Sequence, residues 1–366
     1  MNILKDRFGF KIPTQWIKAE HFYQFDAYYQ PIVDKQCNDW DQLLSEHGHQ
    51  LPALSPQLKQ YVRNGIPNEL RGKVWMHYSG AYNKLNTNPE LYDSLVNTAT
   101  NLGELNEYAE IIRRDLHRTF PDNSEFSCDT ANVNGSVLMI PETNSKLQSL
   151  QNVLLAFSIY SPHIGYCQSL NYLVGFFLLF LKEEKEAFWM LVITINDYFP
   201  EKMYDVTMDG ANLDQTVLLM YIHEKMPSVW DKISNGKSFW EIEKDGLPPI
   251  NLVTSHWFLT LFINILPIET VLRIWDCFFV EGYSVIFRVA LSLIKMNEER
   301  IKDLKDPIEI FQVLQNMPRR LIDCHNFMDY VFSDNNIFND ITSEQIEYRR
   351  SIIQNKHLQK QQKNVY

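Results

Sequence analysis

The sequence predicts an all-α protein, and three observations support that fold class. Apolar residues recur every three to four positions along most of the chain, which is the period of a helix buried on one face. Alternating β-branched runs joined by Asn-Gly or Asp-Gly turns, the usual signal of strands, are nearly absent. Hydrophobic residues make up 45% and aromatic residues 13% of the 366 residues, which is enough to bury a sizeable core.

The first predicted helix begins at Pro67. Proline suits the first helical position because its missing N–H would have no partner there. Leu70, Val74 and Tyr78 then share one face, and Gly80 ends the helix.

A second helix is predicted over residues 102–119, and it ends before Phe120-Pro121 because a proline disfavours helix in the residue that precedes it. Its buried side chains would recur at three- and four-residue spacing, as Leu105, Tyr108, Ile112 and Leu116. Further helices are predicted over residues 147–160, 168–181, 185–199, 215–226, 256–265, 269–280, 285–297 and 308–317.

The predicted organisation is a single multi-helix domain whose two ends differ from its middle. Residues 1–60 are rich in aromatic side chains and form an N-terminal extension that packs on the main domain. The main domain spans residues 61–300, and residues 301–342 are a C-terminal helical part of the same body. No sequence repeat of fixed length is present, which disfavours helical solenoids.

Residues 343–366 form a polar tail, predicted as a last helix that frays at its end. Glu347, Arg350 and Gln354 would share one face of that helix, which we interpret as solvated surface. A basic tail can touch an acidic membrane surface, but five Lys and Arg residues over some two dozen positions are sparse.

Composition narrows the classes of function. The net charge of −11 and the lack of a basic stripe argue against a nucleic-acid partner. Five scattered cysteines without a CxxC pair argue against a disulfide framework and against a zinc site. The longest apolar run, residues 170–181, is shorter than the roughly 20 residues that span a bilayer, and the N-terminus lacks a signal-peptide pattern. We therefore expect a cytoplasmic protein with no transmembrane segment.

Signatures of an intrinsic active site are missing. The sequence contains no GxxxxGK[ST] phosphate loop, no GxSxG elbow, no HExxH pair and no GxGxxG turn. An unrelated helical enzyme would need a nucleophile and a base, and no such constellation stands out. Two other segments carry an arginine and a glutamine. Alone, IRRDLHRT (112–119) is typical of cations at a helix end, and GYCQSLN (165–171) is typical of a helix start.

These two motifs and two further segments follow one another along the chain in an order that closely resembles that of the TBC-domain Rab GTPase-activating proteins. The resemblance covers roughly residues 60–300, and the stretch from RDLHRTFPDN through IGYCQSLNYLVG is further similar to the fungal members linked to polarised secretion. The four segments are RNGIPNELRGKVW (63–75), IRRDLHRT (112–119), GYCQSLN (165–171) and RIWDCFFVEG (273–282).

The resemblance implies that the chain supplies an arginine finger and a glutamine finger in trans to GTP hydrolysis on a Rab. The family's arginine maps to Arg118 and its glutamine to Gln168. A planar guanidinium can neutralise the charge that builds up around the γ-phosphate, an effect worth about 10³–10⁵ in rate for GTPases. A glutamine amide can orient the attacking water and contact the phosphate together. We expect supporting roles for Asp115, Thr119, Tyr166, Asn171, Arg71, Trp75 and Asp276.

The implied partner is a GTP-bound Rab, with an exocytic Rab as the first candidate. GTP and Mg²⁺ would be carried by that partner, so we expect no cofactor of the chain's own, no hydrolysis by the chain alone, and recruitment to sites of polarised growth or secretory membranes. The alternative is a catalytically silent scaffold or effector that binds a GTPase or a polarity complex. The presence of both Arg118 and Gln168 favours the activator, since a scaffold needs neither side chain.

One position departs from the family pattern. Where the family commonly reads YxQGM, this chain has Ser169 after Gln168. Serine is small and can sit in an early helical turn, so we expect function to survive. If this backbone position needs a positive φ, serine would be penalised.

Overall fold

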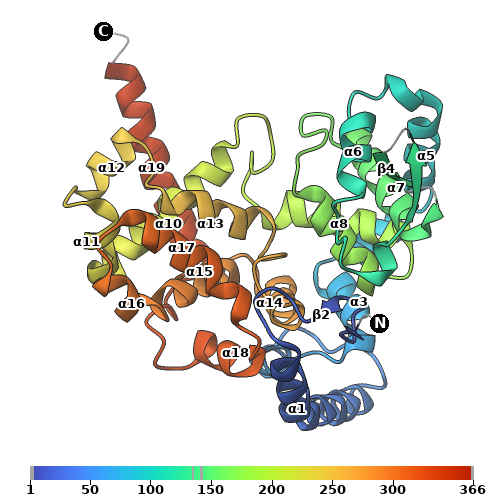
Figure 1. Cartoon of the computed structure of the whole chain (residues 1–366), viewed down its shortest axis with the longest axis horizontal. Coiled ribbons are helices and arrows are strands. Elements are labelled where there is room, and N and C mark those ends of the chain that lie inside the picture. The colour runs from blue at the N-terminus through green and yellow to red at the C-terminus, as the bar shows by residue number, and fades with distance from the viewer. Residues whose placement is uncertain (1–3, 134–135, 141–142, 364–366) are drawn as a thin grey trace. The chain divides into compact units, whose positions relative to one another are not determined.

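The computed structural model describes residues 4–133, 136–140 and 143–363, and it confirms the all-α prediction (Figure 1). The α-helices are α1 Ala19–Glu46, α2 Pro56–Asn64, α3 Asn68–Tyr78, α4 Ala81–Thr87, α5 Leu91–Leu102, α6 Ala109–Leu116, α7 Ser145–Tyr160, α8 Leu170–Phe180, α9 Glu184–Ile193, α10 Asp209–Lys225, α11 Pro227–Ser234, α12 Phe239–Asp245, α13 Ile250–Leu259, α14 Ile268–Glu281, α15 Ser284–Lys295, α16 Glu298–Asp303, α17 Pro307–Asn316, α18 Cys324–Phe332 and α19 Ser343–Lys363.

Short helical turns and two small hairpins complete the secondary structure. Strand β1 (Leu4–Lys5) pairs with β2 (Lys11–Ile12), and β3 (Asp129–Val133) pairs with β4 (Ser136–Ile140), both antiparallel. The 3₁₀ turns are η1 Gly103–Leu105, η2 Ser124–Phe126 and η5 Pro318–Arg320, and a π-helical turn, η4 Thr194–Tyr198, extends α9.

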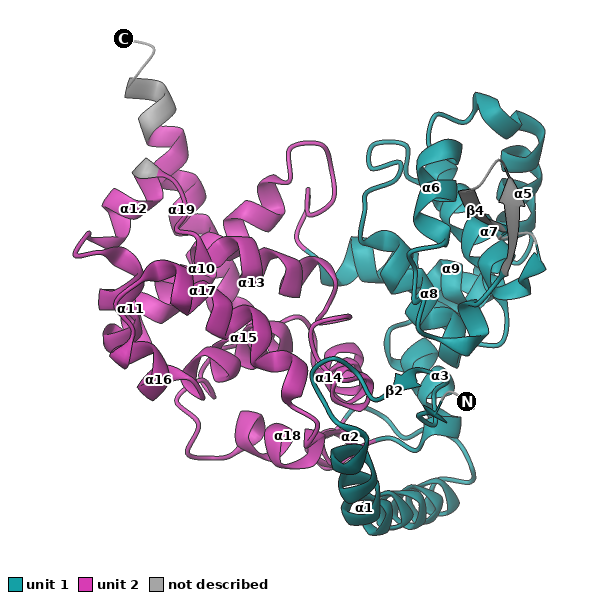
Figure 2. Cartoon of the chain, in the orientation of Figure 1, with its two compact units in different colours: residues 1–54, 66–199 teal, residues 55–65, 200–366 magenta. Residues whose placement is uncertain are grey.

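The chain divides into two compact units, which Figure 2 shows in different colours. Unit 1 comprises residues 1–54 and 66–199, and unit 2 comprises residues 55–65 and 200–366. The division of the sequence at residues 60, 300 and 342 stays a prediction. No helix within the described residues is both long enough and apolar enough to cross a membrane.

Unit 1 is built around α7, which packs against α5, α6, α8 and α9. The inner face of α7 is apolar, and Leu147, Leu150, Leu154 and Phe157 on it are inaccessible to solvent. Burying side chains of this size stabilises a fold by roughly 1.5–3 kcal/mol each. Helices α6 and α8, which overlap the two motifs singled out in the sequence, are therefore fixed against a common central helix.

Several aromatic residues of the N-terminal segment pack within unit 1. The β1–β2 hairpin places Phe8 edge-on against Phe180 at the end of α8, with ring centroids 5.7 Å apart. Phe10 packs in the same way against Phe120, at 5.4 Å. Helix α1 follows, and its Tyr29 is fully buried. The N-terminal segment thus covers the C-terminal end of α8 and the turn that follows Arg118.

The predicted continuous helix over residues 102–119 is wrong. Helix α5 ends at Leu102, Gly103 takes a left-handed φ of +49°, and α6 begins only at Ala109. Leu105, predicted to be buried, is 85% exposed. Local hydrogen bonding overrides the apolar period here, because the side chain of Asn106 accepts a bond from the backbone N–H of Tyr108 and fixes a turn before α6.

Most of the other predicted helices are present with shifted ends. The helix expected to begin at Pro67 begins at Asn68, with Pro67 as its N-cap residue. The helix predicted over 256–265 lies earlier, as α13, and Leu261, Phe262 and Asn264 beyond it have positive φ. Both ends of a helix depend on local capping, which apolar spacing does not report.

Unit 2 has α10, α13 and α15 packed together, and α19 lies against α10. The interpretation of Arg350 as part of a solvated face is wrong, because only 6% of this residue is exposed. Its Nε donates to the fully buried carboxylate of Asp214 on α10 at 2.7 Å, and the Tyr283 hydroxyl donates to the same carboxylate at 2.8 Å. The polar C-terminal helix is therefore attached to unit 2 by a buried ion pair.

Candidate functional site

Arg118 lies just beyond the C-terminal end of α6, and its side chain is 48% exposed. Its Nε donates to Oδ1 of Asp115 at 2.5 Å, and Nη2 contacts the same oxygen. Asp115 is on the last turn of α6 and is only 1% exposed. This side-on pairing uses one edge of the guanidinium, and Nη1 has no partner within the described residues. Arg118 is thus held by Asp115 through Nε and Nη2, while the Nη1 donors remain available to an external group.

The second oxygen of Asp115 binds the glutamine motif. The hydroxyl of Tyr166 donates to Oδ2 of Asp115 at 2.5 Å. Burial, and then the neighbouring Asp115 carboxylate, raise the pKa of Tyr166, so the phenol keeps its proton and remains a donor. One buried carboxylate therefore joins the segment of Arg118 to the segment of Gln168.

A second set of hydrogen bonds runs parallel to the first. Thr119 donates to the backbone carbonyl of Asp115 at 2.7 Å and accepts from Nδ2 of Asn171 at 2.8 Å. The Asn171 Oδ1 in turn accepts from the backbone N–H of Ser169 at 3.2 Å. Thr119, Asn171 and Ser169 are all buried, so these bonds form in a low-dielectric interior, where they fix geometry most firmly.

Gln168 lies between these buried supports, and it is exposed. Tyr166 holds the chain two residues before it, and Ser169 with Asn171 holds the chain just after it. Between them lies Cys167, whose pKa is raised by burial, so its thiol is protonated and suited neither to nucleophilic attack nor to metal binding. The arrangement can present a guanidinium and an amide to an external group, and it contains no reactive nucleophile.

Of the two backbone conformations considered for Ser169, the structure has the one with positive φ. This residue precedes the first turn of α8 and has φ +107° and ψ −30°, a backbone conformation that suits glycine and penalises a Cβ. The serine is 5% exposed, so its backbone cannot relax easily toward an unstrained conformation. The strain lies immediately next to Gln168, and it is compensated by the hydrogen bonds of the neighbouring residues.

We expect Ser169→Gly to raise the free energy of unfolding by about 1 kcal/mol, because glycine adopts this φ without a steric penalty. Denaturant unfolding of the full chain measures the change. Ser127→Gly is the matched control, since Ser127 has an ordinary φ of −75° and glycine there should lower stability slightly. A lower stability of Ser169→Gly than of the wild type would contradict the assignment of strain.

The other predicted supporting residues lie in the framework. Arg71 on α3 is buried and donates to the side chain of Asn68 at 3.2 Å. Trp75 on the same helix is fully buried and packs edge-on against Phe180, with centroids 5.6 Å apart. Asp276 is buried on α14 in unit 2. Of the seven expected supporting residues, the hydrogen bonds join Asp115, Thr119, Tyr166 and Asn171 into the cluster.

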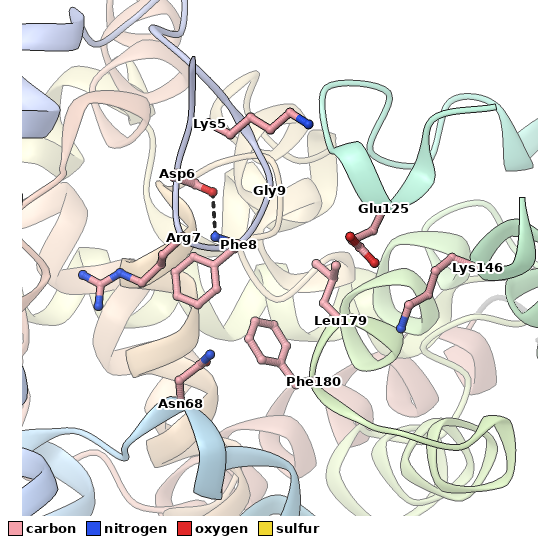
Figure 3. Close-up of a pocket in the computed structure, with 10 residues that line it drawn as sticks. All are labelled: Lys5, Asp6, Arg7, Phe8, Gly9, Asn68, Glu125, Lys146, Leu179 and Phe180. Atoms are coloured by element: carbon pink, nitrogen blue, oxygen red, sulfur yellow. Dashed lines mark hydrogen bonds between the residues drawn. The ribbon is translucent and has the colours of Figure 1, made fainter. Parts of the chain in front are cut away.

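A cavity of about 410 Å³ lies elsewhere in unit 1, under the β1–β2 hairpin (Figure 3). Phe8 and Phe180 line its apolar part, and Glu125 and Lys146 line its polar part. The Lys146 amine donates to the backbone carbonyl of Leu178, and burial lowers the pKa of Lys146. Neither Arg118 nor Gln168 lines this cavity, so it is separate from the cluster around Asp115.

Sequence reasoning missed the contact of Tyr108 with Gly165, a glycine three residues before Gln168. A Cβ built on Gly165 would lie only 2.0 Å from Cζ of the Tyr108 ring, so the ring lies directly on this glycine. The one signal in the sequence was Gly165 itself, at the start of the glutamine motif. Its partner, Tyr108, is 57 positions away, and the apolar period placed Tyr108 on the buried face of a continuous helix over residues 102–119.

Comparisons with known proteins agree with the motifs. Residues 68–302 match the family model of the Rab-GTPase-TBC domain. The chain is 33% identical to the GTPase-activating protein GYP3 and 34% identical to the GTPase-activating protein MSB4, both of Saccharomyces cerevisiae, over 95% of its own length. It spans 63% of the length of GYP3 and 80% of that of MSB4.

A solved structure shares the fold. The crystal structure of the Chlamydomonas flagellar RabGAP TBC domain superposes with a TM-score of 0.70 at 26% identity, covering 90% of this chain and 99% of that one.

Proposed function

Because the chain belongs to the Rab-GTPase-TBC family, we propose that it is a GTPase-activating protein that completes the active site of a GTP-bound Rab. The observation that carries this proposal is the shared carboxylate of Asp115. It accepts hydrogen bonds from Arg118 in one motif and from Tyr166 in the other, while Arg118 and Gln168 remain exposed. A scaffold that only bound a GTPase would need neither exposed side chain nor the buried bonds that orient them.

The chemistry follows from the geometry. When the γ-phosphoryl group leaves GTP, negative charge spreads over its oxygens. Arg118 can donate to those oxygens through Nη1 while Nε stays bound to Asp115, so little side-chain entropy is lost at the moment of reaction. The amide of Gln168 can accept a hydrogen bond from the attacking water and donate to the phosphate. Both contributions are electrostatic and positional.

The chain would need no cofactor of its own, because GTP and Mg²⁺ arrive bound to the GTPase. The partner is a Rab, and within that family an exocytic Rab is our first candidate. The sequence similarity to fungal members linked to polarised secretion supports this choice, as does the match to two yeast GTPase-activating proteins. Recruitment to sites of polarised growth or to secretory membranes is part of the same proposal.

Single-turnover hydrolysis by a panel of GTP-loaded Rabs tests the function. We expect the full chain to accelerate at least one Rab strongly, and an exocytic Rab most. Gln168→Ala should lower that maximal rate by about 10²-fold, since it removes the group that orients water and contacts phosphate. Gln15→Ala, which changes another exposed glutamine, should leave the rate unchanged. If no Rab is accelerated by the wild-type chain, the alternative of a silent scaffold is favoured.

A further inference from the structure

Gly165 and Tyr108 are in direct contact in unit 1. A Cβ at Gly165 would meet three atoms of the Tyr108 side chain, Cζ at 2.0 Å, the hydroxyl oxygen at 2.3 Å and Cε2 at 2.4 Å, so any side chain larger than hydrogen would displace the phenol. Gly165 also has a φ of +60°, which glycine adopts without penalty. The loop before Gln168 is therefore shaped to accept this ring.

Tyr108 is itself held on two sides. It is the N-cap residue of α6, and its backbone carbonyl accepts a hydrogen bond from the N–H of Ile112 in the first turn. Its backbone N–H donates to Asn106, whose side-chain amide donates to the Ser158 hydroxyl on α7 at 3.2 Å. Tyr108 is thus fixed to α6 and, through Asn106, to α7, and its ring is the part that reaches the loop.

Both ends of helix α6 consequently contact the loop that precedes Gln168, at Tyr166 and at Gly165. At the C-terminal end of α6, Asp115 accepts a hydrogen bond from the hydroxyl of Tyr166. At its N-terminal end, the ring of Tyr108 lies on Gly165. Two contacts separated by the length of a helix restrict rotation of the loop, which a single hydrogen bond does not.

We infer that Tyr108 is a positioning residue for Gln168, acting through its ring on Gly165. This inference rests on the proposed function of Gln168. The contact is steric and is made by Cζ, Cε2 and the hydroxyl oxygen; phenylalanine keeps the two ring carbons, so it should replace tyrosine. The expected loss on truncation is in the rate of the chemical step, because the contact orients the segment that carries Gln168.

Kinetics with the most strongly accelerated Rab of the panel separate orientation from binding. We expect Tyr108→Ala to lower the maximal single-turnover rate by roughly 10- to 100-fold, with less than about a threefold change in the half-saturating concentration of the chain. Tyr108→Phe should stay within about twofold of the wild type. Tyr23→Ala, which removes an exposed tyrosine on α1, is the matched control and should change neither value. A rate loss in Tyr108→Phe equal to that in Tyr108→Ala would overturn the steric explanation.

A double-variant cycle tests the contact itself. Gly165→Ala alone should lower the maximal rate by about 10-fold or more, because the added methyl group collides with the ring. In the Tyr108→Ala background the collision is gone and only the penalty of alanine at a φ of +60° remains, so the same change should cost clearly less than it does in the wild-type background. Independent effects that multiply would contradict the inference.

Hydrogen exchange of the free chain gives a readout that needs no GTPase. The amides of Gly165 and Ser169 are bonded to the Ser161 carbonyl and to the Asn171 side chain. In Tyr108→Ala, exchange in residues 164–169 should accelerate by about 10-fold or more, while Tyr108→Phe and Tyr23→Ala leave it unchanged. If the wild type accelerates no Rab, the proposed function fails. If it does and Tyr108→Ala changes neither rate nor exchange, only the role of Tyr108 fails.

Discussion

Replacing Arg118 by alanine is expected to lower the maximal rate of Rab-catalysed GTP hydrolysis by about 10³-fold or more. Alanine removes the guanidinium that would meet the charge on the γ-phosphate, and a loss of that size corresponds to about 4 kcal/mol of barrier. The measurement is single-turnover hydrolysis at saturating concentrations of the chain, with the Rab that the wild type accelerates most. This is the largest single effect on activity that we expect.

Two further variants show whether the planar N–H donors of the Arg118 guanidinium matter as well as its charge. Arg118→Lys keeps a cation but cannot bind Asp115 side-on and also reach a phosphate, so it should recover little of the lost rate. Arg114→Ala removes an exposed arginine on α6, one turn before Arg118, whose Nε is bonded to Glu110, and it should retain the wild-type rate. Full activity of Arg118→Ala would show that the arginine finger has been assigned to the wrong residue.

Replacing Arg350 by alanine is expected to destabilise unit 2 by about 3–5 kcal/mol, the usual cost of removing one partner from a buried ion pair. Burial raises the pKa of Asp214 to about 6, with Arg350 and Tyr283 opposing the rise, so this carboxylate is charged at neutral pH. Without the guanidinium the pKa of Asp214 rises further, so the buried carboxyl either keeps its charge with the Tyr283 hydroxyl as its remaining partner in the cluster or takes up a proton, and both are unfavourable. Thermal and denaturant unfolding of the full chain measure the loss.

The controls separate the buried charge from the loss of packing. In Arg350→Met combined with Asp214→Asn, neither charge remains, so much of the stability should return. Tyr348→Ala changes an exposed residue on the same helix and should cost less than about 0.5 kcal/mol. If Arg350→Ala and the double variant were equally unstable, the ion pair would not be the reason for the loss.

Much of the fold was predictable from the sequence because most helices bury one apolar stripe. The helices predicted over residues 147–160 and 269–280 are present as α7 and α14, with ends within one or two residues. The prediction over residues 102–119 was wrong because Gly103 and Asn106 form a local turn that apolar spacing does not reveal. Arg350 was misjudged for a related reason: its buried partner, Asp214, is 136 positions away.

The two exposed side chains of the candidate site could be located by motif, and their supports could be named by position. The sequence could not show that the two oxygens of Asp115 bind different segments, since that requires α6 and the loop before α8 to be placed in three dimensions. It raised the question of φ at Ser169, which the backbone answers with a value of +107°. Residue types and order were predictable, whereas the long-range contacts were not.

The hydrogen bonds that join the two motifs span long intervals of the sequence. Tyr166 is 51 residues from Asp115, and Asn171 is 52 residues from Thr119, with α7 between them. Closing loops of this length costs conformational entropy before any contact repays it, so these bonds form only after α6, α7 and α8 have packed. A nascent chain that ends before Tyr166 contains Arg118 but not Gln168. We therefore expect the bonds between the two motifs to form together with the packing of α6, α7 and α8, whereas the local pair of Arg118 with Asp115 needs only the end of α6.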